Sequence, residues 1–205
     1  MIHGGFWRAR YDLSHTSHMC AALAEEGIAV ANLEYRRVGE RGGGWPWSYD
    51  DVLAGFDATS RELGGRMVVL GHSAGGHLAL RMAVDRSPAG VVALAPVADL
   101  KMAFELNLSN GAAAEFVGGV PTSEPQRFDA ADPMRHVSKV KRMLLHGSND
   151  DEVPISLSEA FVRARAGDPG EVRLVRIEGA NHYDVIDPES SAWRVVVSGV
   201  LELLA

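Results

Sequence analysis

Cysteine is nearly absent from this sequence, since Cys20 is the single one among 205 residues. One thiol cannot form an internal disulfide, and a zinc site built from several cysteines is excluded. No apolar run reaches the roughly 18 residues that a membrane-spanning helix needs, and no signal peptide is visible. We therefore expect a protein of a reducing compartment, the cytoplasm, with no membrane partner.

Basic residues are also outnumbered by acidic ones. Lys and Arg total 20 whereas Asp and Glu total 27, which gives a net charge of −7. Nucleic-acid binding without sequence preference needs a basic face, so we expect no nucleic-acid partner. The sequence is 46% hydrophobic and 23% charged, which is typical of a globular protein and excludes disorder as the main state. The length predicts one domain over residues 1–205.

Short apolar runs alternate with longer amphipathic stretches along the chain. The runs are brief, rich in Val, Ile and Leu, and typical of parallel strands covered on both faces. They lie at residues 27–33, 67–70, 90–94, 142–145 and 172–177. The stretches between them have apolar residues at helical spacing and lie at residues 17–26, 50–63, 75–85, 156–166 and 191–204. This alternation predicts an α/β domain, a mostly parallel sheet with helices on both faces.

Two segments depart from this alternation. Residues 100–133 are rich in Gly and Pro and carry scattered apolar residues, so we expect a short lid-like insertion there. Residues 41–47 (RGGGWPW) form a glycine-rich loop with two tryptophans, Trp45 and Trp47. These rings need a surface, either the adjacent helix or a bound substrate.

The strongest chemical motif is Gly71–Gly76 (GHSAGG), placed between a predicted strand and a predicted helix. A Gly-x-Ser-x-Gly sequence in that setting forms a nucleophile elbow, in which Ser73 sits on a strained turn with its hydroxyl exposed. The start of the following helix directs its amides toward developing negative charge. A plain turn between strand and helix is the simpler interpretation of the motif alone.

A second motif, His3–Trp7 (HGGFW), suits an oxyanion-binding loop, because a Gly-Gly pair lets backbone amides turn toward an anion. We expect the oxyanion donors to come from Gly5 or Phe6, and from Ala74, the residue after the serine. Trp7 is a candidate for contact with the substrate.

An acid and a histidine follow the last two predicted strands. Asp150 lies in His146–Pro154 (HGSNDDEVP), with Asp151 as the second choice, and His182 lies in Gly179–Tyr183 (GANHY). The order Ser73, Asp150, His182 matches a hydrolase triad in which the acid orients the histidine and the histidine activates the serine.

The remaining histidines receive simpler interpretations. His72 flanks the elbow, where it either packs or contacts the substrate. We assign a structural role to His146. A metal site at His15 and His18 lacks further ligands, so no metal and no organic cofactor is expected.

These motifs resemble those of the α/β-hydrolase superfamily over nearly the whole chain, and they are most similar to its kynurenine formamidase (arylformamidase) and small-esterase branch. His3–Trp7 matches the HGGxW motif of that branch, and Gly71–Leu78 (GHSAGGHL) resembles its elbow, with Gly76 where alanine is common. Asn181–Asp184 (NHYD) resembles its DHFD motif. The elbow followed by Gly76 also resembles the prolyl-oligopeptidase class. The resemblance implies a Ser73–Asp150–His182 triad and an oxyanion hole in the HGGxW loop.

The N-terminus departs from this resemblance. In such folds a full strand and a hairpin precede the HGG loop, whereas here only Met1 and Ile2 precede His3. We therefore expect the sheet to lack its first strands and the oxyanion loop to be anchored at one end only. We also expect an exposed sheet edge, which makes a homodimer a candidate assembly.

The sequence thus predicts a serine hydrolase that cleaves a small carboxylic ester or an aryl formamide through an acyl-enzyme. Small apolar acyl groups are the expected substrates, with Phe6, Trp7, Trp45 and Trp47 near the entrance. A peptidase similar to prolyl oligopeptidase is one alternative. A non-catalytic binding protein with a hydrolase-like fold is another, suggested by the missing first strands.

Overall fold

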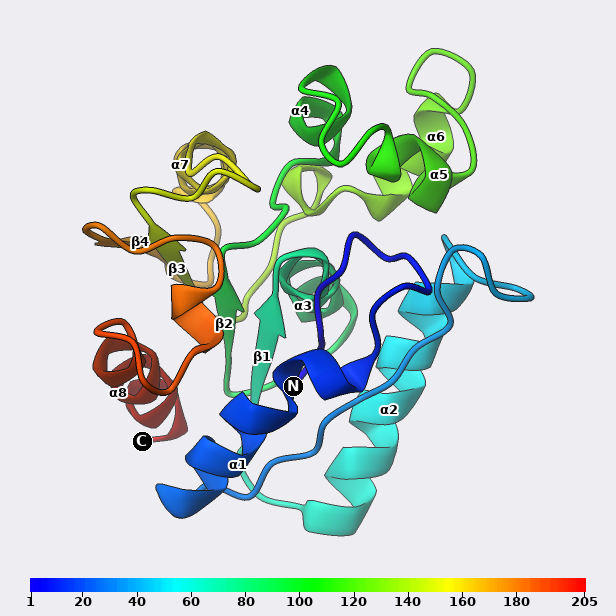
Figure 1. Cartoon of the computed structure of the whole chain (residues 1–205). Coiled ribbons are helices and arrows are strands. Elements are labelled where there is room, and N and C mark those ends of the chain that lie inside the picture. The colour runs from blue at the N-terminus through cyan, green and yellow to red at the C-terminus, as the bar shows by residue number, and fades with distance from the viewer.

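Four parallel strands form the centre of the molecule in the computed structural model, which describes residues 1–205 (Figure 1). Their order in the sheet is the order of the chain, β1-β2-β3-β4, so every connection crosses over to the neighbouring strand. The strands are β1 (Val68–His72), β2 (Gly90–Leu94), β3 (Arg142–Gly147) and β4 (Val172–Ile177). Four of the five predicted strand positions are confirmed, and the carboxyl ends of these strands share one edge of the sheet.

Helices cover both faces of this sheet, as the apolar strand sequences predict. Alternate strand residues pack into two separate cores: Val69, Ala93 and Leu144 point into one, and Leu70, Leu94 and Leu145 into the other. The helices are α1 (Ser17–Glu25), α2 (Trp47–Leu63), α3 (Ala74–Asp85), α4 (Leu100–Glu105), α5 (Ala112–Val117), α6 (Pro125–Ala131), α7 (Ser156–Arg165) and α8 (Trp193–Leu204). Three short 3-10 helices accompany them at Leu13–Thr16, Pro133–Arg135 and Asp184–Ile186. Residues of α2, α3 and α7 belong to the first core, and those of α1 and α8 to the second.

The prediction of a strand at residues 27–33 is wrong. Only Leu33 forms a bridge, to Ile2, and residues 29–31 donate no backbone hydrogen bond. The apolar sequence is present, but a ladder needs several paired residues, and the structure pairs this segment only at the bridge between Leu33 and Ile2. A run of Val and Ala predicts burial here, whereas strand pairing depends on a segment distant in sequence.

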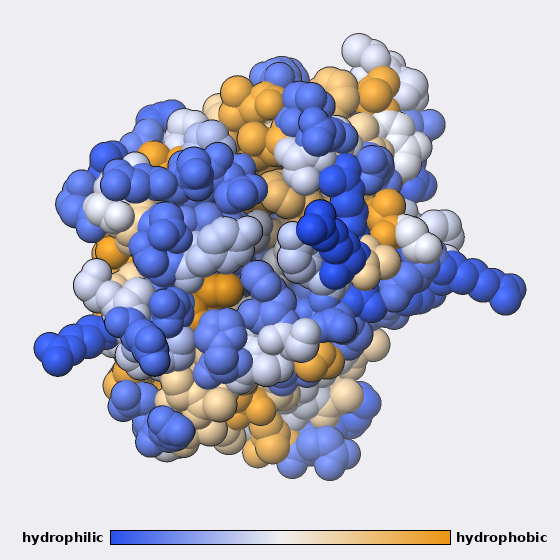
Figure 2. Space-filling view, viewed as in Figure 1, coloured by the Kyte–Doolittle hydropathy of each residue, from blue (hydrophilic) through white to orange (hydrophobic).

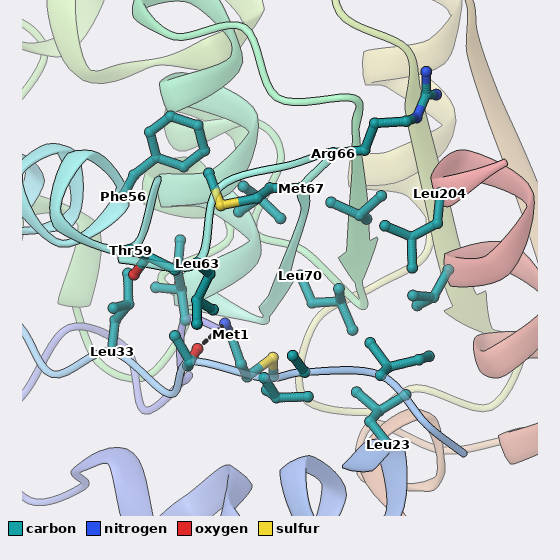
Figure 3. A pocket seen from close by; sticks show the side chains of 18 of the residues that line it. Met1, Leu23, Leu33, Phe56, Thr59, Leu63, Arg66, Met67, Leu70 and Leu204 are labelled. Carbon is teal, nitrogen blue, oxygen red and sulfur yellow. Dashed lines mark hydrogen bonds between the residues drawn. The ribbon is translucent and has the colours of Figure 1, made fainter. Parts of the chain in front are cut away.

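Met1 and Ile2 nevertheless act as a short strand. Ile2 bridges Gly71 on one side and Leu33 on the other, both in parallel, and the Met1 amine donates to the carbonyl oxygen of Ala31 at 2.6 Å. Beyond Met1, the space between β1 and residues 28–31 is an apolar cavity of about 200 Å³ (Figure 3). The figure shows Leu23, Leu33, Phe56 and Leu70 around this cavity, with the Met1 amine at its margin.

The insertion at residues 100–133 folds as the three short helices α4, α5 and α6. Figure 1 shows them gathered above the carboxyl ends of the strands. The side chain of Asp99 begins α4 by accepting from the amide of Met102 at 2.8 Å. Leu100, Phe116 and Phe128 are buried in the same core as α2 and α3. The insertion is therefore an integral layer of the fold, packed on the edge of the sheet where the predicted site lies.

The glycine-rich loop at residues 41–47 places its two tryptophans differently. Trp45 is buried and stacks on Tyr49 of α2, with ring centroids 5.1 Å apart. Trp47 is the first residue of α2 and is exposed. No helix of the structure has both the length and the apolar character needed to cross a bilayer.

Candidate active site

Ser73 occupies the sharp turn between β1 and α3. Its backbone has φ 54° and ψ −115°, in the left-handed region that residues with a side chain rarely adopt. Such a conformation costs about 1–3 kcal/mol and persists only where the surroundings enforce it. Here the Ser73 amide donates to the carbonyl oxygen of Leu94 at 2.8 Å, and its own carbonyl oxygen accepts from the amides of His77 and Val97. The turn is thus fixed by β2 and by the helix that follows.

The glycines of the elbow motif are required by close packing. A Cβ on Gly71 would overlap the backbone of Gly75, and a Cβ on Gly75 would overlap the carbonyl oxygens of Ile2 and His3. The strand, the turn and the N-terminal segment therefore approach one another more closely than any side chain permits. This contact is the physical reason for the Gly-x-Ser-x-Gly pattern, and it places residues 2–5 directly beside Ser73.

Asp150 follows β3 and has a fully buried carboxylate. One oxygen, Oδ1, accepts from the amides of Glu152 and Val153 at 3.0 and 2.8 Å. The other, Oδ2, lies 2.7 Å from His182 Nδ1 and 3.1 Å from His146 Nε2. The neighbouring Asp151 is exposed and makes none of these contacts. Of the two acids considered from sequence, the structure brings Asp150 to the histidine.

The ionisation of Asp150 follows from these donors. Burial acts to raise its pKa, but the hydrogen bonds from His146 and His182 outweigh burial and hold the pKa below its usual range. An ionised carboxylate only accepts hydrogen bonds, so His182 carries its proton on Nδ1. Its other nitrogen, Nε2, is then unprotonated and free to act as a base.

His182 and Ser73 border the same cleft, but no hydrogen bond joins them directly. His182 is nearly fully buried, and its backbone carbonyl oxygen accepts from Nε2 of His72 at 3.0 Å. The Ser73 hydroxyl has no hydrogen-bond partner in the protein. Catalytic contacts of this kind are often long in a ligand-free site and close when a substrate binds.

His72 uses one ring nitrogen, Nε2, in this hydrogen bond, whereas its buried Nδ1 has no hydrogen-bond partner. Burial lowers the pKa of this histidine well below its usual range, so the ring is neutral. It lies with its centroid 4.7 Å from that of His182 and also borders the cleft. The sequence left substrate contact and packing open for His72; the structure gives it a hydrogen bond that supports the His182 loop.

The HGG loop presents free amides beside Ser73. Gly5, Phe6 and Trp7 have consecutive positive φ values of 102°, 50° and 58°. Such a run turns successive N–H groups toward one concavity, and the amides of Gly5, Phe6 and Ala74 donate no hydrogen bond within the protein. The residues predicted to supply oxyanion donors therefore have donors available.

The expectation that this loop is anchored at one end only is wrong. At its start, Ile2 donates to Leu70 and accepts from His72, and the His3 ring lies 2.8 Å from Glu34 Oε1. At its end, the amide of Val38 donates to the carbonyl oxygen of Trp7 at 2.7 Å. Two residues suffice as an anchor because Ile2 is paired on both sides.

Trp7 does not line the cleft. Its indole is 1% exposed and stacks on Phe116 of α5 with ring centroids 4.6 Å apart. The whole residue is buried, its backbone included. Its position gives Trp7 a packing role between the loop and the insertion, in place of the substrate contact expected from sequence.

The cleft itself is small and mostly polar, with a volume of about 140 Å³. Figure 2 shows a hollow near the middle of this face, between the N-terminal loop and the segment after β4, with hydrophilic residues around much of its rim. The rim includes Arg8, Arg10, Tyr11, His15, Ser109, Glu152 and Tyr183. Of the four aromatic residues expected at the entrance, Phe6 alone borders the cleft. The expectation of an apolar, tryptophan-lined entrance is therefore not met.

No group of three or more His, Cys, Asp or Glu residues is close enough to hold an ion. Sequence reasoning missed the position of His146, whose Nε2 lies 3.1 Å from Asp150 Oδ2. The sequence signal for this proximity was that His146 lies four residues before Asp150, at the end of a predicted strand.

Sequence comparison identifies a family. The profile of the Prolyl oligopeptidase family matches residues 14–196. A search of curated protein sequences finds no significant match. The resemblance to the kynurenine formamidase branch stays a prediction.

Several solved structures share the fold at low sequence identity. A truncated form of a carbohydrate esterase from gut microbiota is 18% identical, with a TM-score of 0.79 over 99% of this chain and 84% of that chain. Esterase B from Lactobacillus rhamnosis is 19% identical, with a TM-score of 0.81 over 99% of this chain and 73% of that chain. The HSL homologue EstE7 from a metagenome library is 20% identical, with a TM-score of 0.80 over 100% of this chain and 77% of that chain. These similarities show the α/β-hydrolase fold.

Close packing at the elbow predicts the effect of one added methyl group. Gly75→Ala should lower the free energy of unfolding by about 1–3 kcal/mol or more, because the new Cβ meets the carbonyl oxygens of Ile2 and His3. Urea denaturation measures the loss. The control is Gly167→Ala, where nothing lies within 4 Å of the added atom and the expected change is within about 0.5 kcal/mol. Equal stabilities for the two variants would refute the close approach.

Proposed function

Since the chain belongs to the prolyl oligopeptidase family and is by class a serine hydrolase, we propose that it cleaves small carboxylic esters through an acyl-enzyme on Ser73. The observation that carries this proposal is the 2.7 Å contact between Asp150 and His182, at the rim of the cleft that also holds the strained Ser73 turn. In the proposed reaction Ser73 is the nucleophile, His182 the general base, and Asp150 the residue that orients His182.

Acylation follows from these roles. His182 Nε2 takes the proton of the Ser73 hydroxyl as Oγ attacks the carbonyl carbon of the ester. The ring becomes positively charged, and the ionised carboxylate of Asp150 stabilises it at Nδ1. His182 then protonates the departing alcohol. Water attacks the acyl-enzyme by the same sequence, which releases the acid and restores Ser73.

The free amides at the cleft would bind the oxyanion. Negative charge develops on the carbonyl oxygen during attack, and fixed N–H donors stabilise it more than they stabilise the neutral ester. Gly5, Phe6 and Ala74 supply these donors in our proposal, because their amides have no other partner. One such donor is typically worth about 3–4 kcal/mol of transition-state stabilisation.

The dimensions of the cleft support a small acyl group. Its volume of about 140 Å³ lies below the roughly 300 Å³ at which sites for drug-sized ligands begin. The polar rim favours an ester with a polar alcohol portion over a long apolar chain. The similar solved structures, a carbohydrate esterase and esterase B among them, point in the same direction.

Specific observations also support two other classes of substrate. The family match favours a peptidase that cleaves beside proline. The resemblance of His3–Trp7 and Asn181–Asp184 to the kynurenine formamidase motifs favours an aryl formamide. Both use the same nucleophile and base, but their leaving group is an amine instead of an alcohol, and their acyl groups differ from that of the ester.

The nucleophile is tested by nitrophenyl acetate hydrolysis with the chain and its Ser73→Ala variant. We expect the variant to lose several orders of magnitude in kcat, because the acyl-enzyme cannot form. An N-formyl arylamide and a prolyl nitroanilide are assayed beside the ester, and we expect the ester to have the highest kcat/KM.

Equal activity of the Ser73→Ala variant would exclude the serine mechanism. A formamide or anilide cleaved faster than the ester would replace the ester as the substrate class. A chain that is inactive toward all three would favour the non-catalytic binding protein.

The identity of the acid is tested by two neighbouring substitutions. Asp150→Asn should lower kcat by about 10⁴-fold, because an amide donates where His182 Nδ1–H needs an acceptor and so favours the wrong tautomer. Asp151→Asn is the matched control, because it removes the same negative charge from the adjacent residue, which is exposed. We expect it to change kcat less than about threefold, since surface charges are screened. A larger loss from the Asp151 variant would reverse the assignment.

A further inference from the structure

His146 is buried at the carboxyl end of β3, and all of its ring nitrogens have partners. Its Nε2 lies 2.9 Å from the carbonyl oxygen of Val153 and 3.1 Å from Asp150 Oδ2. Its Nδ1 lies 2.7 Å from the hydroxyl of Ser158 in α7. The ring therefore connects α7 to the carboxylate that orients His182, although it touches neither the serine nor the cleft.

The partners determine which nitrogen of His146 carries the proton. Both atoms facing Nε2 are oxygens that only accept, a carbonyl and an ionised carboxylate, so Nε2 is the protonated nitrogen. The hydroxyl of Ser158 has no other acceptor within the protein and donates to Nδ1. Ser158 thus fixes the tautomer of His146, as Asp150 fixes that of His182.

His146 and His182 share one oxygen of the carboxylate. His182 Nδ1 donates to Oδ2, and His146 Nε2, whose single N–H donates to the Val153 carbonyl oxygen, lies 3.1 Å from the same carboxylate oxygen. Two backbone amides hold Oδ1. With both oxygens held, the carboxylate cannot rotate about its Cβ–Cγ bond without losing several charge-assisted hydrogen bonds. The contact with His146 also counts among the causes that keep the pKa of Asp150 low against the effect of burial.

We propose that His146, with its tautomer fixed by Ser158, is a positioning residue of the hydrolytic site, which holds the Asp150 carboxylate in the orientation that leaves His182 Nε2 free as the base. This inference rests on the proposed function. It adds two residues, Ser158 and His146, to the triad of Asp150, His182 and Ser73. Both act by positioning the residue next to them and do not touch the substrate.

A purely structural role is the competing explanation. The contact with the Val153 carbonyl closes the loop from residue 150 to 153, so loss of His146 could reduce activity by loosening that loop. The two roles differ in one respect. A residue that acts through the charge of Asp150 loses its effect when that charge is removed, whereas a loop-closing residue keeps its effect.

The first test compares His146→Gln with His146→Asn. The amide nitrogen of Gln reaches the position of Nε2 and can donate to Asp150, whereas that of Asn is too short. We expect kcat for nitrophenyl acetate to stay within about threefold for Gln and to fall roughly 10- to 100-fold for Asn, as loss of a hydrogen bond to a charged group predicts. KM should stay unchanged for both, because neither residue touches the substrate. Thermal unfolding is recorded for each variant.

The second test repeats both substitutions in the Asp150→Asn background. We expect the difference between Gln and Asn to disappear there, which is the signature of coupling between the two sites. If the difference persists at full size, His146 closes the loop and the proposal is overturned. An Asn variant that keeps the kcat of the unsubstituted chain overturns it as well.

Ser158→Ala provides a measurement that does not depend on the His146 variants folding. Without the hydroxyl, Nδ1 can take the proton, and we expect a smaller fall in kcat, roughly three- to tenfold, at unchanged KM. A kcat equal to that of the unsubstituted chain would contradict the role of Ser158. A different result would overturn the proposed function itself: no hydrolysis of the ester by the unsubstituted chain, or full activity of Ser73→Ala. The inference about His146 would then fall as well.

Discussion

The buried carboxylate of Asp150 imposes the strictest requirement in this molecule. A negative charge removed from water is costly unless donors surround it. Here two amides and His182 donate to the carboxylate, and His146 Nε2 lies 3.1 Å from it. These groups come from the end of β3, from the loop beyond it and from the loop after β4. Their positions depend on parallel strands that end at one edge of the sheet. The ionised carboxylate in turn determines the tautomer of His182, on which the proposed chemistry depends.

The nucleophile side of the site rests on a different physical device, which is close backbone packing. Ser73 keeps its left-handed conformation because Leu94, Val97 and His77 bind its backbone. Gly75 allows Ile2 and His3 to approach the turn, so that a segment of two residues can hold the HGG loop against β1. The site therefore joins a strained turn, an anion-binding loop and a base, each fixed by contacts outside the cleft.

Local sequence patterns predicted the strands β1 to β4, the five long helices and the elbow, because each is encoded by apolar periodicity or by glycine placement within a few residues. The predicted strand at residues 27–33 failed, since pairing depends on a distant partner that periodicity cannot reveal. Trp7 was expected at the substrate, but positive φ values at Phe6 and Trp7 turn its indole into the core. His146 received a structural role because its contact with Asp150 arises from the loop's conformation, which spacing alone does not specify. The polar rim of the cleft also combines segments far apart in sequence.

The central claim is that Ser73 is a nucleophile activated by His182 and Asp150. A fluorophosphonate probe reacts with such a serine, and peptide mass spectrometry then locates the adduct. Our account predicts about one equivalent of label per chain, on the peptide that contains Ser73, and no label on the chain that carries Asp150→Asn within the same reaction time. Absence of label on the unsubstituted chain, or label on a different serine, would contradict it.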